Sequence, residues 1–335
     1  IDRGSIAESV SGLSSSLCTN HSKLNERQGV TVSGFACFLP SEAMIHLRGN
    51  KIPEFLQGQL TCDTRKLSVG NAVMGALCNV KGRVLSDILV LQLSDSHIVL
   101  RLRQSLASNV ADTLRRYAQF SRISVDLDSR EDAIIGTRES GEISDYEPRA
   151  AGSMATTLCD GILTLRRGSA FGEVLSIDPH KPIDLAGRVA SQTLDAEPRW
   201  AMETLRNGHY ALELEDLEAF TPQALNYDLT GLVAFDKGCY TGQEIVARLH
   251  YKGHSKRRLQ VLEATHDLDT PAIARDTPLL TPEGITVGRC LRAESAADAP
   301  TVLAAEVQSE YLNTVLLLTN GEQLRPLAHE ATHNQ

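Results

Sequence analysis

One short segment of the chain, residues 236–250, concentrates side chains that could do chemistry. It reads Asp-Lys-Gly-Cys-Tyr-Thr-Gly-Gln-Glu and continues Ile-Val-Ala-Arg-Leu-His. Thr241, followed by Glu244 ahead of an apolar run, is a capping-box pattern, which predicts that a helix begins at Thr241. Cys239 would then lie just before a helix N-terminus, where the helix dipole and the nearby Lys237 favour the thiolate over the thiol.

Two roles for Cys239 fit this spacing. The flanking Gly238 and Gly242 would leave the sulfur approachable, as a reactive or ligand-forming thiolate requires. The same glycines would also let the side chain pack inward as a small apolar group. The other six cysteines show no CxxC or CxxxC spacing, which argues against zinc-ribbon and thioredoxin sites and predicts buried free thiols in a reducing compartment. The scattered histidines predict no metal site built by this chain alone.

The segment around Cys239 resembles the signature of the YgfZ family, folate-binding proteins related to the glycine-cleavage T protein. The other residues that match this signature are Lys237, Gly238, Tyr240, Gly242, Gln243, Glu244 and Arg248. Segments 55–63, 79–83 and 220–226 are similar to further family segments. The resemblance runs from about residue 35 to about residue 320.

The resemblance implies an α+β fold. Two intertwined N-terminal α+β subdomains of the T-protein type are followed by a C-terminal β-barrel, and they surround an opening that accepts tetrahydrofolate. It also implies a role in maturing or repairing iron–sulfur enzymes, including tRNA-modifying ones, with Cys239 as the critical thiol. The expected partners are a folate, extended or not by a polyglutamate tail, and iron–sulfur client proteins. A folate-dependent aminomethyl transferase is the alternative, so the assignment as an enzyme stays open.

Trp200 is the position that the resemblance assigns to the folate rings. It matches a tryptophan that the family uses against folate, and an indole face suits a flat pterin or aminobenzoate ring. The alternative is a core tryptophan on an amphipathic helix, and the chain has only this one Trp. Some family members place a second tryptophan on the folate, and the corresponding position here is near Glu42.

Asp87 and Arg206 are the residues that distinguish the iron–sulfur accessory role from aminomethyl transfer. The T protein has a pair of aspartates where this chain has Ser86 and Asp87, and one of its folate-contacting glutamates matches Arg206. Exchanging an anion for a cation removes an acceptor for the pterin N–H groups, which argues against standard aminomethyl transfer. We expect Arg206 to pair with a folate carboxylate or with a nearby acid such as Glu203. Asp87, Trp200 and Arg206 are therefore the predicted cofactor-binding residues.

The charge balance argues against a broad nucleic-acid surface. The chain has 33 Lys and Arg against 42 Asp and Glu, a net charge of −9, and only one Trp, seven Tyr and seven Phe. One segment departs from this balance, with five cations and no acid: Arg248, Lys252, Lys256, Arg257 and Arg258. Such a run is typical of a solvated face. A polyglutamate tail or the phosphates of tRNA are the alternative partners of this segment.

A length of 335 residues favours two or three domains. We expect a flexible or short helical segment at 1–28, the folate-binding module at 29–256 and a β-barrel at 257–330. Within the module the apolar patterns predict strands at 72–78, 84–93 and 98–102 and helices at 53–60, 104–118 and 198–208. Between the first two strands they predict a turn in which Gly82 is free to take a positive φ. Residues 128–153 read as a surface connection and 213–218 as a solvated acidic loop. No apolar run is long enough for a membrane span, which favours a cytoplasmic protein with no membrane partner and leaves a mitochondrial location open.

Overall fold

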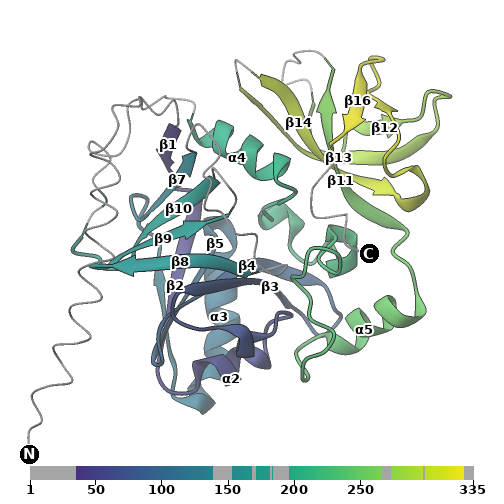
Figure 1. Ribbon diagram of the computed structural model, residues 1–335. Coiled ribbons are helices and arrows are strands. Elements are labelled where there is room, and N and C mark those ends of the chain that lie inside the picture. Colours follow the sequence, from purple (N-terminus) through teal and green to yellow (C-terminus); the bar gives the residue numbers. More distant parts are fainter. Residues whose placement is uncertain are drawn as a thin grey trace, which may run out of the picture.

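The computed structural model describes residues 35–138, 153–167, 171–181, 183, 196–265, 273–296 and 299–327 (Figure 1). The expected N-terminal segment 1–28 lies outside this part of the chain. Ten strands of the described chain form one antiparallel sheet: β1 (Phe35–Phe38), β2 (Glu42–Arg48), β3 (Asn71–Cys78), β4 (Val84–Ser94), β5 (His97–Arg103), β6 (Ser124–Asp128), β7 (Ile134–Arg138), β8 (Ser153–Cys159), β9 (Ile162–Arg166) and β10 (Phe171–Ser176). Their order is β1-β7-β10-β9-β8-β3-β4-β5-β2-β6.

The strand order shows that two halves of the sheet are intertwined. The chain starts in one half with β1, builds the other half from β2 to β6, and returns to pair β7 with β1 before it adds β8 to β10. The halves join where β3 pairs with β8, from Asn71 opposite Ala155 to Val73 opposite Ser153. The two intertwined α+β subdomains expected from the sequence are confirmed.

Helix α3 (Gln104–Ser121) covers the β2–β6 half of the sheet. Its buried residues Leu106, Val110 and Leu114 recur every four positions, which places them on one face of the helix. The helix ends at Arg122 in a left-handed conformation with φ of 55°. The short helix α2 (Ile52–Gln57) packs with the 3₁₀ turn η1 (Thr64–Lys66) in the same half. The predicted helices at 104–118 and 53–60 are therefore confirmed within a few residues.

A closed barrel follows the sheet in the chain. It is built from β11 (Arg257–Ala264), β12 (Pro278–Leu280), β13 (Thr286–Ala296), β14 (Ala299–Gln308), β15 (Leu316–Leu317) and β16 (Gln323–Pro326). In β16 Leu324 is the one buried residue, so the strand has no apolar pattern of its own. Helix α4 (Ala196–Arg206) lies between the sheet and the barrel and contacts β1, β13 and β14 (Figure 1).

Shorter elements connect the sheet to the barrel. They are the 3₁₀ turns η2 (Leu214–Asp216) and η3 (Pro222–Leu225) and the helix α5 (Gln243–Lys252); a further 3₁₀ turn, η5 (Ser309–Tyr311), follows β14. In Figure 1, α5 lies below the barrel, beside the turn that joins β3 and β4. Among the described residues, no helix is both long and apolar enough to cross a membrane.

The structure corrects the interpretation of residues 128–153 as a surface connection. This segment contains β7, whose Ile134 and Ile135 are both buried. The apolar run is short and ends at Gly136, so it is weak evidence for a strand on its own. Pairing with β1 on one side and β10 on the other buries it.

The acidic segment 213–218 is also not simply a solvated loop. Asp216 is buried, accepts a hydrogen bond from the Tyr210 hydroxyl at 2.8 Å and forms an ion pair with Arg275 of the barrel region at 2.7 Å. Glu213 pairs with Arg103. Cations from distant parts of the chain neutralise these acids. A local sequence pattern cannot predict such partners, because they are far away in the sequence.

Candidate functional site

The helix after the signature cysteine begins later than the sequence predicts. Gly242 is the N-cap of α5, with φ of 85°, and no side chain caps the helix, so the capping box at Thr241 is wrong. A Cβ on Gly242 would lie 2.4 Å from the Asn79 carbonyl oxygen. The close approach of the β3–β4 turn therefore decides the backbone conformation here, and only glycine fits it.

The segments that carry the family resemblance meet around this loop. Gly82 of the β3–β4 turn, at φ of 67° as predicted, faces Ile245 of α5. Gln223 donates a side-chain hydrogen bond to the carbonyl of Val246 at 2.8 Å. The Thr241 amide donates to the Gly58 carbonyl at 3.2 Å. Four segments far apart in the sequence thus form one contiguous structure.

The side chain of Lys237 points into the protein. Its ammonium group donates to the carbonyl oxygens of Gln57, Leu60 and Cys62 at 2.9, 2.6 and 2.7 Å. Burial lowers the pKa of this amine to about 8. Three backbone carbonyls hold the Lys237 charge, and its effect on the Cys239 thiol stays a prediction. Its role is to tie the signature loop to the end of α2.

Cys239 is an exposed free cysteine. A Cβ added at the neighbouring Gly238 would meet no atom within 4 Å, so the loop is open to solvent, and the inward-packed alternative is excluded. Four other cysteines are buried as predicted, and burial raises the pKa of each: Cys37, Cys62, Cys78 and Cys290. Cys159 is disulfide-bonded, which corrects the expectation of free thiols throughout.

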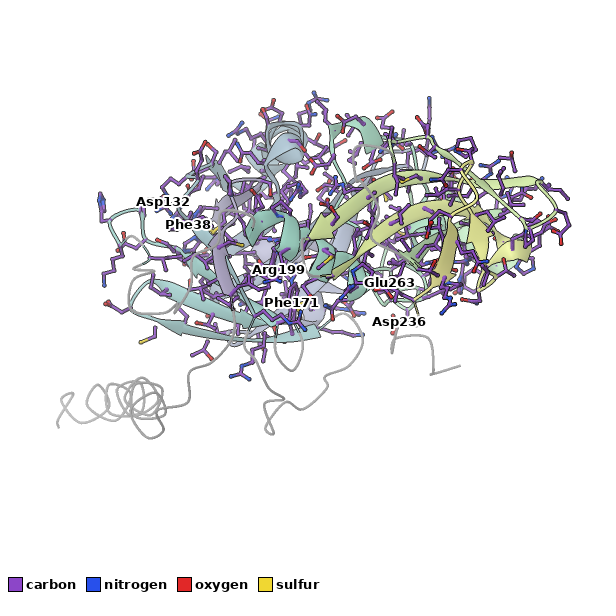
Figure 2. All side chains as sticks on the ribbon, turned by 90° about the horizontal axis from the view of Figure 1, so that it is seen from above. Phe38, Asp132, Phe171, Arg199, Asp236 and Glu263 are labelled. Carbon is purple, nitrogen blue, oxygen red and sulfur yellow. The ribbon has the colours of Figure 1, made fainter. Side chains whose placement is uncertain are left out.

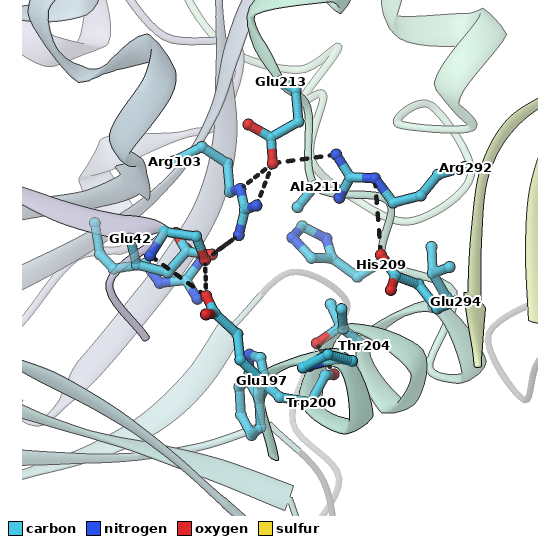
Figure 3. Close-up of a pocket in the computed structure, with 15 residues that line it drawn as sticks. Glu42, Arg103, Glu197, Trp200, Thr204, His209, Ala211, Glu213, Arg292 and Glu294 are labelled. Atoms are coloured by element: carbon cyan, nitrogen blue, oxygen red, sulfur yellow. Dashed lines mark hydrogen bonds and ion pairs between the residues drawn. The ribbon is translucent and has the colours of Figure 1, made fainter. Parts of the chain in front are cut away.

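A pocket of about 330 Å³ lies away from this loop, where the sheet, α4 and the barrel meet (Figure 3). Its lining is Ser41, Glu42, Arg101, Arg103, Glu197, Pro198, Trp200, Ala201, Thr204, Leu205, His209, Ala211, Glu213, Arg292 and Glu294. Glu42 and Trp200, the two positions where the resemblance places folate-side tryptophans, both line it. Cys239 does not.

Charged side chains of both signs line the pocket. Arg103 contacts Glu42 at 3.0 Å and the Ser41 hydroxyl at 2.7 Å, and it forms a further ion pair with Glu213 (Figure 3). Arg292 of the barrel reaches the same Glu213 carboxylate at 3.1 Å. A ligand here would meet donors and acceptors already fixed in place by one another. No group of three His, Cys, Asp or Glu side chains suited to a metal ion occurs in the part of the chain that the structure describes.

Trp200 lines the pocket and is also packed tightly against the sheet. Its ring stacks on Phe171 with centroids 4.1 Å apart and planes 15° apart, and the side chain is 4% exposed. A Cβ on Gly136 would lie 2.4 Å from Trp200 Cε3, so the indole sits directly over the β7 backbone. The indole is almost fully buried although Trp200 lines the pocket, and its contact with folate remains a prediction.

Asp87 lies on β4 behind the pocket rather than in its lining. Its carboxylate is 3.2 Å from His209 Nε2, and His209 lines the pocket. Burial by itself would raise the pKa of Asp87, but the hydrogen bond and charge of His209 and the charge of Arg101 outweigh it and lower that pKa. Asp87 is therefore an anion, and it is connected to the pocket through the imidazole of His209.

Arg206 joins α4 to the barrel. It forms an ion pair with Glu263 of β11 at 2.8 Å (Glu263 is labelled in Figure 2) and is not among the pocket residues. Glu203, the local acid suggested by the sequence, pairs instead with Arg138. That suggestion is wrong, because i and i+3 on α4 point to different neighbours.

The cationic segment 248–258 divides into two parts. Arg258 is held by Asp228 at 2.9 Å and Arg257 approaches Glu306 at 3.6 Å. Arg248, Lys252 and Lys256 are exposed. The candidate site residues that the sequence did not reveal are those of the pocket, Arg103, His209, Glu213 and Arg292, because they lie on different elements and share no local motif.

Comparisons with known proteins agree with this fold. The family model of the GCVT N-terminal domain matches residues 27–138. The chain is 28% identical to the tRNA-modifying protein YgfZ of Colwellia psychrerythraea over 224 residues, which cover 66% of this chain and 68% of that one. It is also 28% identical to that of Blochmanniella pennsylvanica over 230 residues, covering 67% and 70%.

A solved structure extends the likeness to most of the chain. The glycine cleavage system aminomethyltransferase T of Bartonella henselae superposes with a TM-score of 0.64 at 16% identity and covers 89% of this chain and 86% of that one. At this identity the match establishes the fold alone. The chain therefore resembles the YgfZ proteins over two thirds of its length and has the fold of the glycine cleavage aminomethyltransferase.

Proposed function

We propose that this chain is a folate-binding accessory protein for the maturation or repair of iron–sulfur enzymes, including tRNA-modifying ones, and that it uses the Cys239 thiol. The observation that carries the proposal is the combination, in one fold, of a polar pocket and an exposed thiol outside it. The name of the similar proteins, tRNA-modifying protein YgfZ, supports the tRNA-linked clients.

The pocket residues fit the head group of a folate. The pocket volume of about 330 Å³ is at the lower end of the range for small-molecule sites, roughly 300–1,000 Å³. This volume suits the bicyclic ring of a folate, with the tail of the folate outside the pocket. The carboxylates of Glu197 and Glu294 can accept from N–H groups, and the arginines can donate to a carbonyl. Tetrahydrofolate bound here would supply a carrier for one-carbon units.

The first test is titration of the protein with tetrahydrofolate, followed by Trp200 fluorescence and by calorimetry. We expect saturable binding with one site. Ala211→Phe, which fills the pocket, should abolish binding while circular dichroism stays unchanged. Cys239→Ser should bind as the unchanged protein does, because Cys239 lies outside the pocket. Absence of binding, or binding that survives Ala211→Phe, would overturn the folate site.

The second test addresses the client role. The test uses a bacterial strain from which the gene for its own YgfZ protein has been deleted. In that strain the unchanged chain should restore the activity of an iron–sulfur tRNA-modifying enzyme. Cys239→Ser should fail although it folds and binds folate. Full restoration by Cys239→Ser would remove the thiol from the proposal.

One observation favours the aminomethyl transferase as a second candidate. Asp87 remains at one of the two acid positions, and its partner His209 opens into the pocket. If this pair acts as acid or base on a one-carbon folate, the chain should exchange labelled carbon between folates, and Asp87→Asn should stop the exchange. A chain that binds tetrahydrofolate but exchanges no label is not a transferase.

A further inference from the structure

We propose that the exposed surface around Cys239 is a docking site for a partner protein that presents an acidic, partly apolar surface to the thiol. We define the Cys239 face as the exposed side chains of Val80, Lys81, Ile245, Arg248, Tyr251 and Lys252, which lie on the β3–β4 turn and on α5, the helix that follows the cysteine loop. The inference deepens the proposed role of Cys239, on which it rests, and needs no bound folate.

The Cys239 face is continuous across two elements. Val80 and Lys81 lie at the tip of the β3–β4 turn, beside Gly82, and a Cβ on Gly82 would lie 2.9 Å from Ile245 Cβ. From Ile245 the helix presents Arg248 and Lys252 at i+3 and i+7, which keeps them on one side of α5. The cysteine loop leads directly into this helix.

Its cations are available to a partner. The side chains of Lys81, Arg248 and Lys252 are exposed, and no ion pair to another described residue holds them. The exposed acids nearby in the chain are Asp236 and Glu244. In a chain of net charge −9, this excess of cations is local. Acids on a partner would gain attraction and orientation here.

Apolar side chains lie among these cations. Val80 is 76% exposed, Tyr251 69% and Ile245 38%. A patch with an apolar centre and a charged rim is typical of protein–protein interfaces. RNA fits less well, because stacking needs several free aromatic faces. Phe235 and His250 already stack on each other at 3.6 Å, and Tyr251 is the one aromatic residue of the Cys239 face.

The thiol itself points to a macromolecular partner. The residues of the pocket do not include the loop, and the space beside Gly238 is open. The described pocket therefore does not hold a small substrate against the sulfur. A docked surface would supply that positioning, and the Cys239 face lies on the helix that follows the loop and on the turn that packs against that helix.

The experiment measures how fast Cys239 reacts with peptides of different charge. The experiment uses three peptides of equal length, and each carries one cysteine as its mixed disulfide with thionitrobenzoate. The first peptide is acidic and contains Leu and Phe, the second is neutral, and the third is basic. The Cys239 thiolate attacks the peptide sulfur, coloured thionitrobenzoate leaves, and a protein–peptide disulfide forms. We expect the acidic peptide to react about tenfold faster than the basic one at low salt, and the difference to disappear at high salt.

Matched variants isolate the surface. The triple variant Lys81→Glu, Arg248→Glu, Lys252→Glu should reverse the order of the peptides, whereas Arg116→Glu on the distant helix α3 should leave it unchanged. A small neutral disulfide, dithiodipyridine, measures the intrinsic reactivity of the thiol in each variant, and Cys239→Ser gives the background from other cysteines.

Two results would overturn the proposal. Equal rates for the three peptides, or a preference that survives the triple variant, would show that the Cys239 face does not select acidic partners. Protection of Cys239 by a short RNA oligonucleotide, without a preference for the acidic peptide, would assign the surface to RNA instead. Since no folate is present in these assays, their outcome is separate from that of the folate titration.

Discussion

The ammonium nitrogen of Lys237 lies 2.6 Å from the carbonyl oxygen of Leu60, 177 residues earlier in the chain. The same group also holds the carbonyls of Gln57 and Cys62. Two residues before the exposed Cys239, the signature segment is thus anchored in the interior. A fixed loop base with an open tip presents the thiol without burying it.

Replacing Lys237 by Met should lower the free energy of unfolding by about 2 kcal/mol, because buried carbonyls lose their donor. The pH dependence should change as well. The folded pKa is about 8 against an ordinary 10.5, so between these values the unfolded chain binds more protons and stability rises with pH. Lys237→Met should lose this rise. Urea unfolding at several pH values measures both effects, and Lys66→Met, at an exposed lysine, is the control. A variant with the pH profile of the unchanged protein would contradict this account.

Gly242→Ala should destabilise the protein more than a positive φ alone explains. Gly242 and Gly321 have nearly the same φ, 85° and 87°, but a Cβ on Gly321 meets no atom within 4 Å. We expect Gly321→Ala to cost about 1 kcal/mol and Gly242→Ala about 3 kcal/mol, the excess being the clash with Asn79. Chemical denaturation measures the pair. Equal costs would mean that the β3–β4 turn moves away freely.

Asp87→Asn should cost about 3 kcal/mol, because it leaves His209 without its buried anion. The pKa of Asp87 is lowered from the ordinary 3.8. Its stabilising contribution is therefore fully present above 3.8 and is lost as the pH falls toward the lower folded pKa. Acid unfolding should show this loss in the unchanged protein and not in the variant. Asp95→Asn, at an exposed aspartate, should behave as the unchanged protein does.

Gly136→Ala should shift the fluorescence emission of Trp200 to the red, since the new methyl group would displace the indole. We expect a loss of about 2 kcal/mol in stability. Phe171→Leu removes the aromatic ring that stacks on Trp200, and it should shift the emission of Trp200 in the same direction. Unchanged emission in both variants would show that the indole is not held by these two residues.

Periodic patterns predicted the elements that depend on local burial. Leu106, Val110 and Leu114 identified α3, and the strands flanking Gly82 identified the β3–β4 hairpin, because one buried face imposes a spacing that the sequence displays. The same reasoning failed for β7 and β16, which are buried by their partners rather than by a long apolar run of their own.

The sequence by itself determined the signature segment, its resemblance and the positive φ at Gly82, since each is a property of neighbouring residues. Tertiary structure decided the rest. It bonded Lys237 to the carbonyl of Leu60, paired Arg206 with Glu263, stacked Trp200 on Phe171 and brought Glu42, Arg103, His209 and Arg292 to one pocket. The physical reason is that charges and rings are satisfied by partners in space, and chain folding, not spacing in the sequence, selects those partners.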